Sequence, residues 1–191
     1  MDEGGAADGD RGVSADSVSD STPFAMLGWP VLFGRTKRQI ESAYLVRSAG
    51  AHPDLADADG AGFVDAAALN DARRALLDDE TRANLVLSAI GGPAASEDDS
   101  LPDGFLMEIM ETRMEIEAAL AAGDEAERAK WVEWAGEQRS AFAGRVGEAL
   151  DSADDETAQR DVRRTLNAWR YIERLIEQLD PGYDPASADF A

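Results

Sequence analysis

Residues 40–54 read IESAYLVRSAGAHPD, and this stretch decides the fold of the first half of the chain. Side chains of its first part recur at the i, i+3, i+4, i+7 spacing of a helix with one inward face: Ile40, Ala43, Tyr44 and Arg47. Thr36 is a suitable N-cap for this helix. The helix must end before His52-Pro53-Asp54, because the residue that precedes a proline is pushed out of the helical region. The sequence therefore predicts a helix up to about Gly50, followed by a loop.

A second helix with one apolar face follows the loop. Its inward positions are Phe63, Ala66, Leu69, Ala72 and Leu76. A shorter helix, roughly residues 80–90, ends at Gly91-Gly92-Pro93, a strong stop signal. The first half is therefore expected to be an antiparallel helical hairpin with short flanking helices.

Three longer helices are predicted in the second half, over about residues 102–122, 124–150 and 155–179. The inward face of the second of them carries Trp131, Ala135, Gln138, Phe142 and Val146, and that of the third carries Val162, Leu166, Trp169, Ile172, Ile176 and Leu179. Short connections favour antiparallel neighbours. We therefore expect an all-α protein in which the hairpin is linked to a C-terminal three-helix bundle.

Composition suggests where these units begin and end. Residues 1–22 are Gly, Ala, Asp and Ser with few large apolar side chains, which predicts a disordered acidic tail. Small, acidic and proline residues over 93–102 predict a linker between a first domain at 23–92 and the bundle at 103–180. Residues 181–191 are predicted to be a C-terminal tail.

The overall charge limits the classes of partner. The formal net charge of −21 repels phosphate groups, which argues against nucleic acid and anionic membrane surfaces. No apolar stretch approaches the length of a transmembrane helix, and the N-terminus does not resemble a secretory signal. The chain has no Cys and one His, so no metal site and no cofactor is expected. A cytoplasmic monomer is the simplest expectation.

His52, Pro53 and Asp54 offer an imidazole and a carboxylate in a stiffened loop without a nucleophile, which suits recognition better than catalysis. With Ala43-Tyr44 eight residues before the His, and with Leu69-Asn70-Asp71-Ala72, Leu76, Asp78 and Arg82-Ala83 after it, residues 23–91 resemble the J-domain family. The resemblance implies that the loop contacts a DnaK-type ATPase chaperone and stimulates its ATP hydrolysis. The basic residues of the preceding helix, Lys37, Arg38 and Arg47, are the expected further chaperone contacts.

The second half narrows the resemblance. Phe105-Leu106-Met107-Glu108 with Met110-Glu111, and the segment from Trp169 to Leu175, are similar to the first and last C-terminal helices of the HscB family of iron–sulfur co-chaperones. This resemblance implies that the bundle binds the scaffold protein of iron–sulfur cluster assembly. The implied client-binding residues are Leu106, Met107, Met110, Glu111 and Tyr171, to which we add Met114 from the same helix face.

The residues themselves also indicate a binding face. At about 100° per residue, Phe105, Ile109, Ile116 and Leu120 share an arc of about 60°, which is enough to pack a helix on its neighbours. The adjoining arc carries Leu106, Met107, Met110 and Met114. Methionine adapts well to a partner's surface. The second arc is therefore expected either to bind a partner or to pack against another part of the same chain.

Two departures from the family patterns stand out. Ser48 to Ala51 and Leu55 occupy positions around the His-Pro-Asp tripeptide where J-domains usually have basic residues. We therefore expect weaker or more specialised stimulation. Met114 occupies a position where the HscB pattern often has an acid, so the client surface is expected to differ there.

Three other interpretations compete with this one. An enzyme is disfavoured because no catalytic motif is found, and the Asp57-Ala58-Asp59 segment lacks the oxygen ligands of a calcium loop at Ala61 and Ala68. A helical adaptor with a degenerate, non-stimulating J-domain stays open. A general J-protein for other clients also stays open, although the Gly/Phe-rich or zinc-binding segments typical of that class are missing from the sequence.

Overall fold

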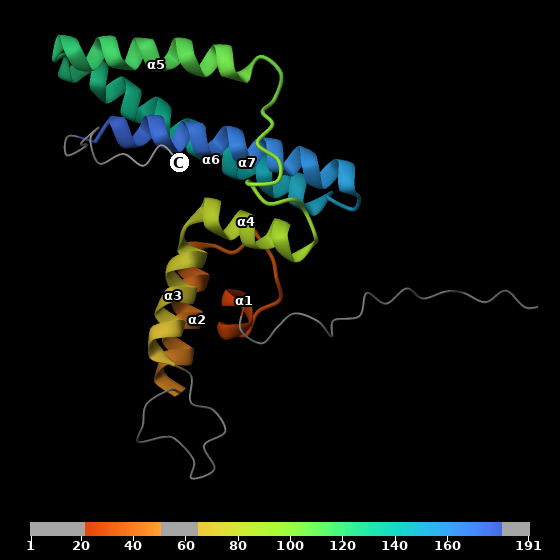
Figure 1. Cartoon of the computed structure of the whole chain (residues 1–191). Helices are drawn as coiled ribbons and strands as arrows, with labels where there is room; N and C mark the ends of the chain where they lie inside the picture. Colours follow the sequence, from red (N-terminus) through yellow and green to blue (C-terminus); the bar gives the residue numbers. More distant parts are fainter. Residues whose placement is uncertain (1–21, 51–64, 181–191) are drawn as a thin grey trace, which may run out of the picture.

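The computed structural model describes residues 22–50 and 65–180, which form seven α-helices and no strand (Figure 1). The helices are α1 (Pro23–Met26), α2 (Lys37–Gly50), α3 (Ala66–Leu77), α4 (Asp79–Ala89), α5 (Phe105–Ala122), α6 (Glu125–Asp151) and α7 (Glu156–Gln178). The all-α prediction is confirmed. None of these helices is long and apolar enough to cross a lipid bilayer.

Helices α2 and α3 lie side by side as the predicted hairpin, and α1 packs against α3 (Figure 1). Ile40 and Leu76 are completely buried between them. On the flank of the hairpin, the Arg73 guanidinium donates two hydrogen bonds, of 2.8 and 2.6 Å, to the carboxylate of Glu41. The N-terminus of α2 is closed by a reciprocal cap, because Gln39 N–H donates to Thr36 Oγ1 and Thr36 N–H donates to Gln39 Oε1.

Helices α6 and α7 make the most extensive helix pair, and α5 packs on both of them. The predicted inward faces are largely correct: Phe142 and Val146 of α6 are buried, as are most of the predicted α7 positions. Leu175 of α7 is buried as well, whereas Ile176, predicted to point inward, is only partly buried. Helix α5 begins at Phe105 rather than near residue 102, because Gly104 adopts a left-handed conformation with φ of 80° at the N-cap.

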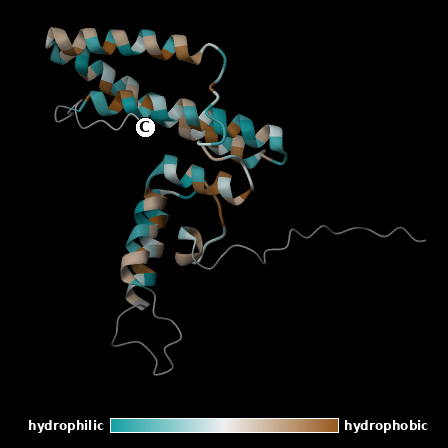
Figure 2. Cartoon of the chain, viewed as in Figure 1, coloured by the Kyte–Doolittle hydropathy of each residue, from teal (hydrophilic) through white to brown (hydrophobic). Residues whose placement is uncertain are grey.

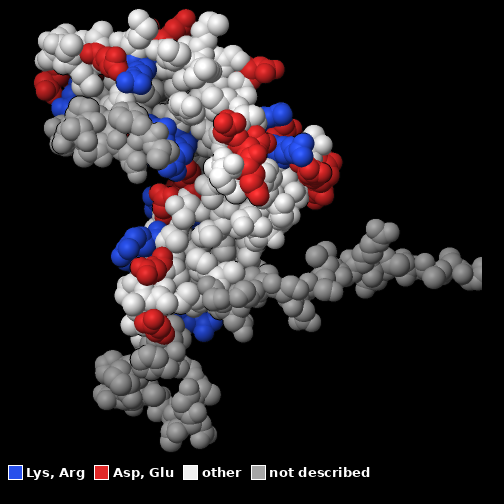
Figure 3. Space-filling model, in the orientation of Figure 1, with Lys and Arg blue, Asp and Glu red and all other residues white. Residues whose placement is uncertain are grey.

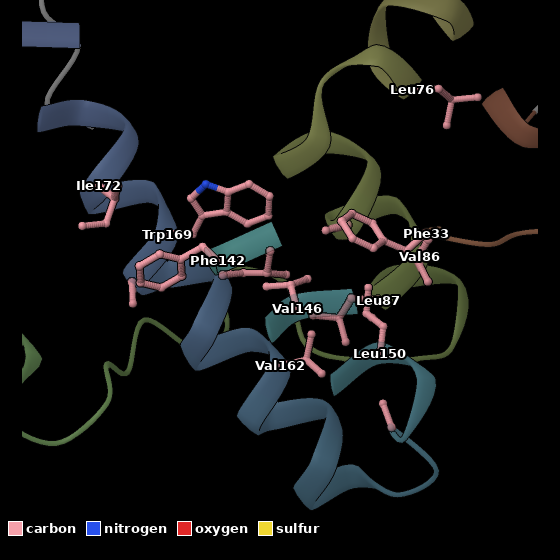
Figure 4. Close-up of a cluster of buried hydrophobic side chains, with 14 of the residues drawn as sticks. Phe33, Leu76, Val86, Leu87, Phe142, Val146, Leu150, Val162, Trp169 and Ile172 are labelled. Atoms are coloured by element: carbon pink, nitrogen blue, oxygen red, sulfur yellow. The ribbon is translucent and has the colours of Figure 1, made fainter. Parts of the chain in front are cut away.

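Helix α4 joins the hairpin to the bundle by packing on α6 and α7. Leu87 of α4 is fully buried beside Val146 and Leu150 of α6, with Phe33 and Val86 on the other side (Figure 4). These side chains belong to one continuous apolar core that runs from the hairpin into the bundle. The two halves therefore share their packing rather than folding around separate cores.

A buried arginine fixes the corner between α3 and α4. Arg82 is only 4% exposed, and its guanidinium donates hydrogen bonds to the backbone oxygens of Phe33 (3.0 Å) and Leu76 (2.5 Å) and to the carboxylate of Asp79 (2.5 Å). The guanidinium also lies over the Phe33 ring, with its carbon 4.9 Å from the ring centroid. A charge this deeply buried is tolerated because all of these partners compensate its lost hydration.

The segment before α5, which the sequence predicts to be a linker, is hydrogen-bonded along α7. Arg163 Nε donates to the Pro93 oxygen at 2.9 Å, and Asn167 Nδ2 donates to the oxygens of Asp98 and Ser100, both at 2.9 Å. Burial of Arg163 lowers the pKa of its guanidinium. These bonds join the segment to α7, and the shared core packs the hairpin against the bundle.

Candidate functional site

A long apolar surface lies on α5, where brown segments recur along the helix in Figure 2. Four large apolar side chains of this helix are more than half exposed: Leu106 (51%), Met107 (70%), Met110 (58%) and Met114 (68%). Tyr171 of α7 is also exposed, at 37%. We call these five residues the methionine face. Contiguous apolar side chains on a protein surface commonly mark a site of interaction.

The other apolar arc of α5 holds the helix in place. Ile109 and Ile116 are buried, and Phe105 makes edge-to-face contacts with Phe142 of α6 and Tyr171 of α7, with ring centroids 6.4 and 6.1 Å apart. The Phe105–Tyr171 contact brings the α7 residue to the beginning of the α5 surface. The two arcs inferred from the sequence thus differ in burial: one packs on the bundle, and the other faces solvent. The role of the exposed arc in client binding stays a prediction.

Charged groups border the methionine face. Glu111 is exposed, and two residues further on Arg113 donates a 2.7 Å hydrogen bond to Glu117. On the face of the molecule drawn in Figure 3, acidic and basic side chains lie next to each other in several places on a largely uncharged surface. An apolar centre with a polar border is the usual composition of a protein–protein interface. A partner that fits here presents apolar side chains and a hydrogen-bond donor for Glu111.

His52, Pro53 and Asp54 lie outside the described residues, so the structure gives no geometry for the tripeptide. It describes both helices that flank the loop, α2 before it and α3 after it. The chaperone contact assigned to the tripeptide stays a prediction.

The three basic residues of α2 point in different directions. Lys37, at the beginning of the helix, lines a cavity between the hairpin and the bundle together with Glu80 and Glu173. Arg47 lies near the end of the helix, and a Cβ placed on Gly28 would be 2.2 Å from a terminal nitrogen of its guanidinium. Arg38 is exposed. The sequence places these residues on one helix. The structure shows that they do not form one basic patch, which the sequence could not predict.

The cavity beside Lys37 is lined mainly by charged groups that the sequence did not connect. Glu80 of α4 lies 3.3 Å from Arg170 of α7. Burial raises the pKa of Glu80, and the Arg170 charge opposes that effect. Glu173 accepts hydrogen bonds from Arg139 at 2.8 Å and from the Trp169 indole at 2.8 Å. Only the i, i+4 spacing of Trp169 and Glu173 was visible in the sequence.

One of these contacts, the Glu80–Arg170 ion pair, joins α4 to α7, and the Arg139–Glu173 ion pair joins α6 to α7. Among the described residues, no three His, Asp or Glu side chains are grouped so that they could hold a metal ion. The cavity is therefore best described as a polar border of the interface between the two halves.

Sequence comparison identifies the family. The model of a family described as the HSCB C-terminal oligomerisation domain matches residues 101–180. The co-chaperone protein HscB homolog of Burkholderia multivorans is 31% identical over 170 residues, which cover 85% of this chain and 94% of the relative. The chain belongs to the HscB co-chaperone family. The HscB homolog of Azoarcus sp. is similarly close, at 31% identity over 82% of this chain and 90% of the relative.

Solved structures agree with this HscB-family fold. Chaperone HscB from Vibrio cholerae superposes with a TM-score of 0.64 at 23% identity, covering 83% of this chain and 94% of that one. Human co-chaperone protein HscB superposes with a TM-score of 0.63 at 21% identity, covering 82% of this chain and 79% of the human one. The combination of a J-type hairpin and a C-terminal helical unit is thus the HscB arrangement.

Proposed function

We propose that this chain is a J-type co-chaperone that stimulates ATP hydrolysis by a DnaK-type chaperone and delivers to it the scaffold protein of iron–sulfur cluster assembly. In this proposal, the His52-Pro53-Asp54 loop contacts the chaperone and the methionine face holds the scaffold. The chain itself carries out no catalysis. Membership of a co-chaperone family supports the first half of the proposal.

The observation that carries the client-binding half is the exposure of the methionine face. Four large apolar side chains on one helix are left mostly in water, although the same helix has a separate arc that packs on the bundle. Leaving such side chains exposed stabilises neither the helix nor the core, so a surface of this kind is best explained by a partner that covers it. Glu111 at its border supplies a charged acceptor that fixes how the partner lies.

The packed joint between the two halves supports the combination of both roles. The shared core around Leu87 and the hydrogen bonds from α7 to the segment 93–100 hold the hairpin against the bundle. A client on α5 and a chaperone at the tip of the hairpin are then kept in one relative orientation.

Single-turnover ATP hydrolysis by the cognate DnaK-type chaperone tests the proposal. The unmodified chain should accelerate hydrolysis, and His52→Gln should abolish the acceleration while the circular dichroism spectrum stays unchanged. If the chain and the variant accelerate hydrolysis equally, the His52-Pro53-Asp54 loop is not responsible for the stimulation.

A non-stimulating adaptor is the second candidate, and one observation favours it: the basic residues of α2 are few and do not gather on one side. The same assay separates the two candidates. An adaptor binds the scaffold protein but leaves the rate of hydrolysis unchanged both with and without the His52→Gln substitution.

A further inference from the structure

The side of α2 that faces away from the core is apolar near the end of the helix. Leu45 is 62% exposed and Val46 is 74% exposed, and they are the most exposed large aliphatic side chains of the described residues. At about 100° per residue, they share an arc of about 100° with three other exposed residues: Arg38, Ser42 and Ala49. We call these five residues the outer α2 face. Only Arg38, at the far end of the helix from the loop, carries a charge.

The other charged side chains of α2 are turned away from this face. The opposite side of the helix packs on α3 and carries Ile40, Ala43 and Tyr44. Lys37 lines the cavity beside the bundle, and the guanidinium of Arg47 lies against Gly28. Glu41 is paired with Arg73 of α3. The outer α2 face is thus mainly apolar. The charged side chains nearby contact other parts of the molecule and do not belong to it.

We infer that the outer α2 face docks on an apolar patch of the DnaK-type chaperone, so that this co-chaperone recognises its chaperone by apolar contact rather than by charge attraction. The inference rests on the proposed function and names the chemistry of its partner. Leu45 and Val46 would be the residues that select the chaperone.

Position along the chain identifies the occupant. Val46 precedes His52 by only six residues, so a protein that grips the loop is within reach of the outer α2 face. The chain's own N-terminal segment is a poor alternative, because residues 1–21 contain only Met1, Val13 and Val18 as larger apolar side chains. A second copy of the chain would bring a second net charge of −21 to the contact.

The net charge of the chain also favours an apolar docking surface on the chaperone. With a net charge of −21, the chain is repelled over long range by any partner whose J-binding surface is acidic. Apolar contacts act at short range and need no opposite charge. An apolar patch on the chaperone is therefore the surface that this face can bind.

The experiment measures the affinity of the full-length chain for the ATP-bound cognate chaperone by fluorescence anisotropy, and separately measures single-turnover ATP hydrolysis. The double variant Leu45→Gln, Val46→Gln removes the apolar contact without adding charge. Its dissociation constant should rise about tenfold while the maximal rate of hydrolysis stays the same. Val132→Gln is the matched control, because Val132 is 52% exposed on α6 and should leave both quantities unchanged.

The double variant Leu45→Lys, Val46→Lys distinguishes apolar from electrostatic docking. Apolar docking predicts that it weakens binding, and that the unmodified chain loses less than about twofold in affinity between about 50 mM and about 300 mM KCl. Tighter binding by the lysine variant, or a steep salt dependence of the unmodified chain, would overturn the inference. A fall in melting temperature of the glutamine variant well beyond that of Val132→Gln would overturn it too, since the face would then be covered by the chain itself.

The two proposals fail separately. Binding that follows the expected pattern without any stimulation of hydrolysis rejects the proposed function and supports the docking surface. Stimulation that is lost in His52→Gln, together with unchanged affinity of the glutamine variant, supports the function and rejects the docking surface. A chain that neither binds nor stimulates the chaperone rejects both.

Discussion

The methionine face predicts a binding defect whose size follows from the exposure of its side chains. Leu106 and Met110 are 51% and 58% exposed, so about half of each side chain remains to be covered by a partner. Complete burial of such a side chain is worth about 1.5–3 kcal/mol, and covering the exposed half is thus worth about 1 kcal/mol. The double variant Leu106→Ser, Met110→Ser should therefore lose about 2 kcal/mol of binding free energy, or about thirtyfold in the dissociation constant.

Isothermal titration calorimetry with the iron–sulfur scaffold protein measures this loss directly. The variant also gives up the buried half of each side chain, so its free energy of unfolding should fall by about 1–2 kcal/mol while its helical content at 25 °C is retained. Val132→Ser is the matched control, since Val132 is exposed to the same extent, at 52%, on α6. It should be destabilised to a smaller degree and should bind the scaffold normally.

Two results would refute this reasoning. An unchanged dissociation constant in a folded variant would mean that the scaffold does not cover the methionine face. Loss of helical content would mean that Leu106 and Met110 hold α5 on the bundle, a role that their exposure assigns instead to Ile109 and Ile116.

Three further predictions concern the joint and the turns. Leu87→Ala should lower the free energy of unfolding by about 3 kcal/mol in urea denaturation, because Leu87 is 0% exposed where α4 meets the bundle; a change below about 1 kcal/mol would contradict the shared core. Burial raises the pKa of Glu80 above its ordinary value of 4.5, so the folded state binds the proton more tightly than the unfolded state, and stability should rise as pH falls through the raised pKa towards 4.5. Glu80→Gln should remove that rise from a pH series of melting temperatures, and an unchanged pH profile would show that Glu80 is not the group responsible. Gly28→Ala should destabilise by about 1–2 kcal/mol, because Gly28 has φ of 75° and a Cβ added there would lie 2.2 Å from the Arg47 guanidinium, whereas Gly136→Ala, whose Cβ would meet open space, should stabilise by about 0.5–1 kcal/mol. Equal effects of the two substitutions in thermal unfolding would contradict the assigned backbone conformations.

Helical periodicity in the sequence was sufficient for the fold class. The α7 stripe that includes Val162, Leu166 and Trp169 has enough apolar positions at helical spacing to mark its inward side, and all three side chains are buried. The capping residue Thr36 could be predicted for a similar reason, because a cap acts within three residues of itself. Patterns of this kind involve residues close together in the sequence, so they do not depend on how the rest of the chain folds.

The joint between the halves could not be predicted in the same way. Leu87 reads as an ordinary core residue of the hairpin, and nothing in its neighbourhood shows that it packs against residues about sixty positions later. Arg82 and Arg163 are also unexpected, since buried arginines depend on backbone oxygens from distant segments such as Phe33 and Pro93. Long-range contacts of this kind leave no periodic trace in a single sequence.

The candidate site was predicted in part. Helix arithmetic separated the two arcs of α5, and the exposed arc is the one that the family resemblance assigned to the client. The same arithmetic placed Arg47 on the inward side of α2, and this prediction is wrong. Arg47 is exposed in the structure, and only its guanidinium lies against Gly28. The apolar outer α2 face could not be predicted, because the sequence does not distinguish exposed Leu45 and Val46 from buried leucine and valine residues.

Steady-state ATP hydrolysis by the cognate chaperone, measured with the co-chaperone and the scaffold protein together and apart, tests the link between the two surfaces most directly. The account predicts that the two proteins together accelerate hydrolysis by more than the sum of their separate effects. It also predicts that the double variant Leu106→Ser, Met110→Ser keeps its own stimulation but loses this excess. If the excess is absent from the unmodified chain, or persists undiminished in the variant, the scaffold is not delivered on the methionine face.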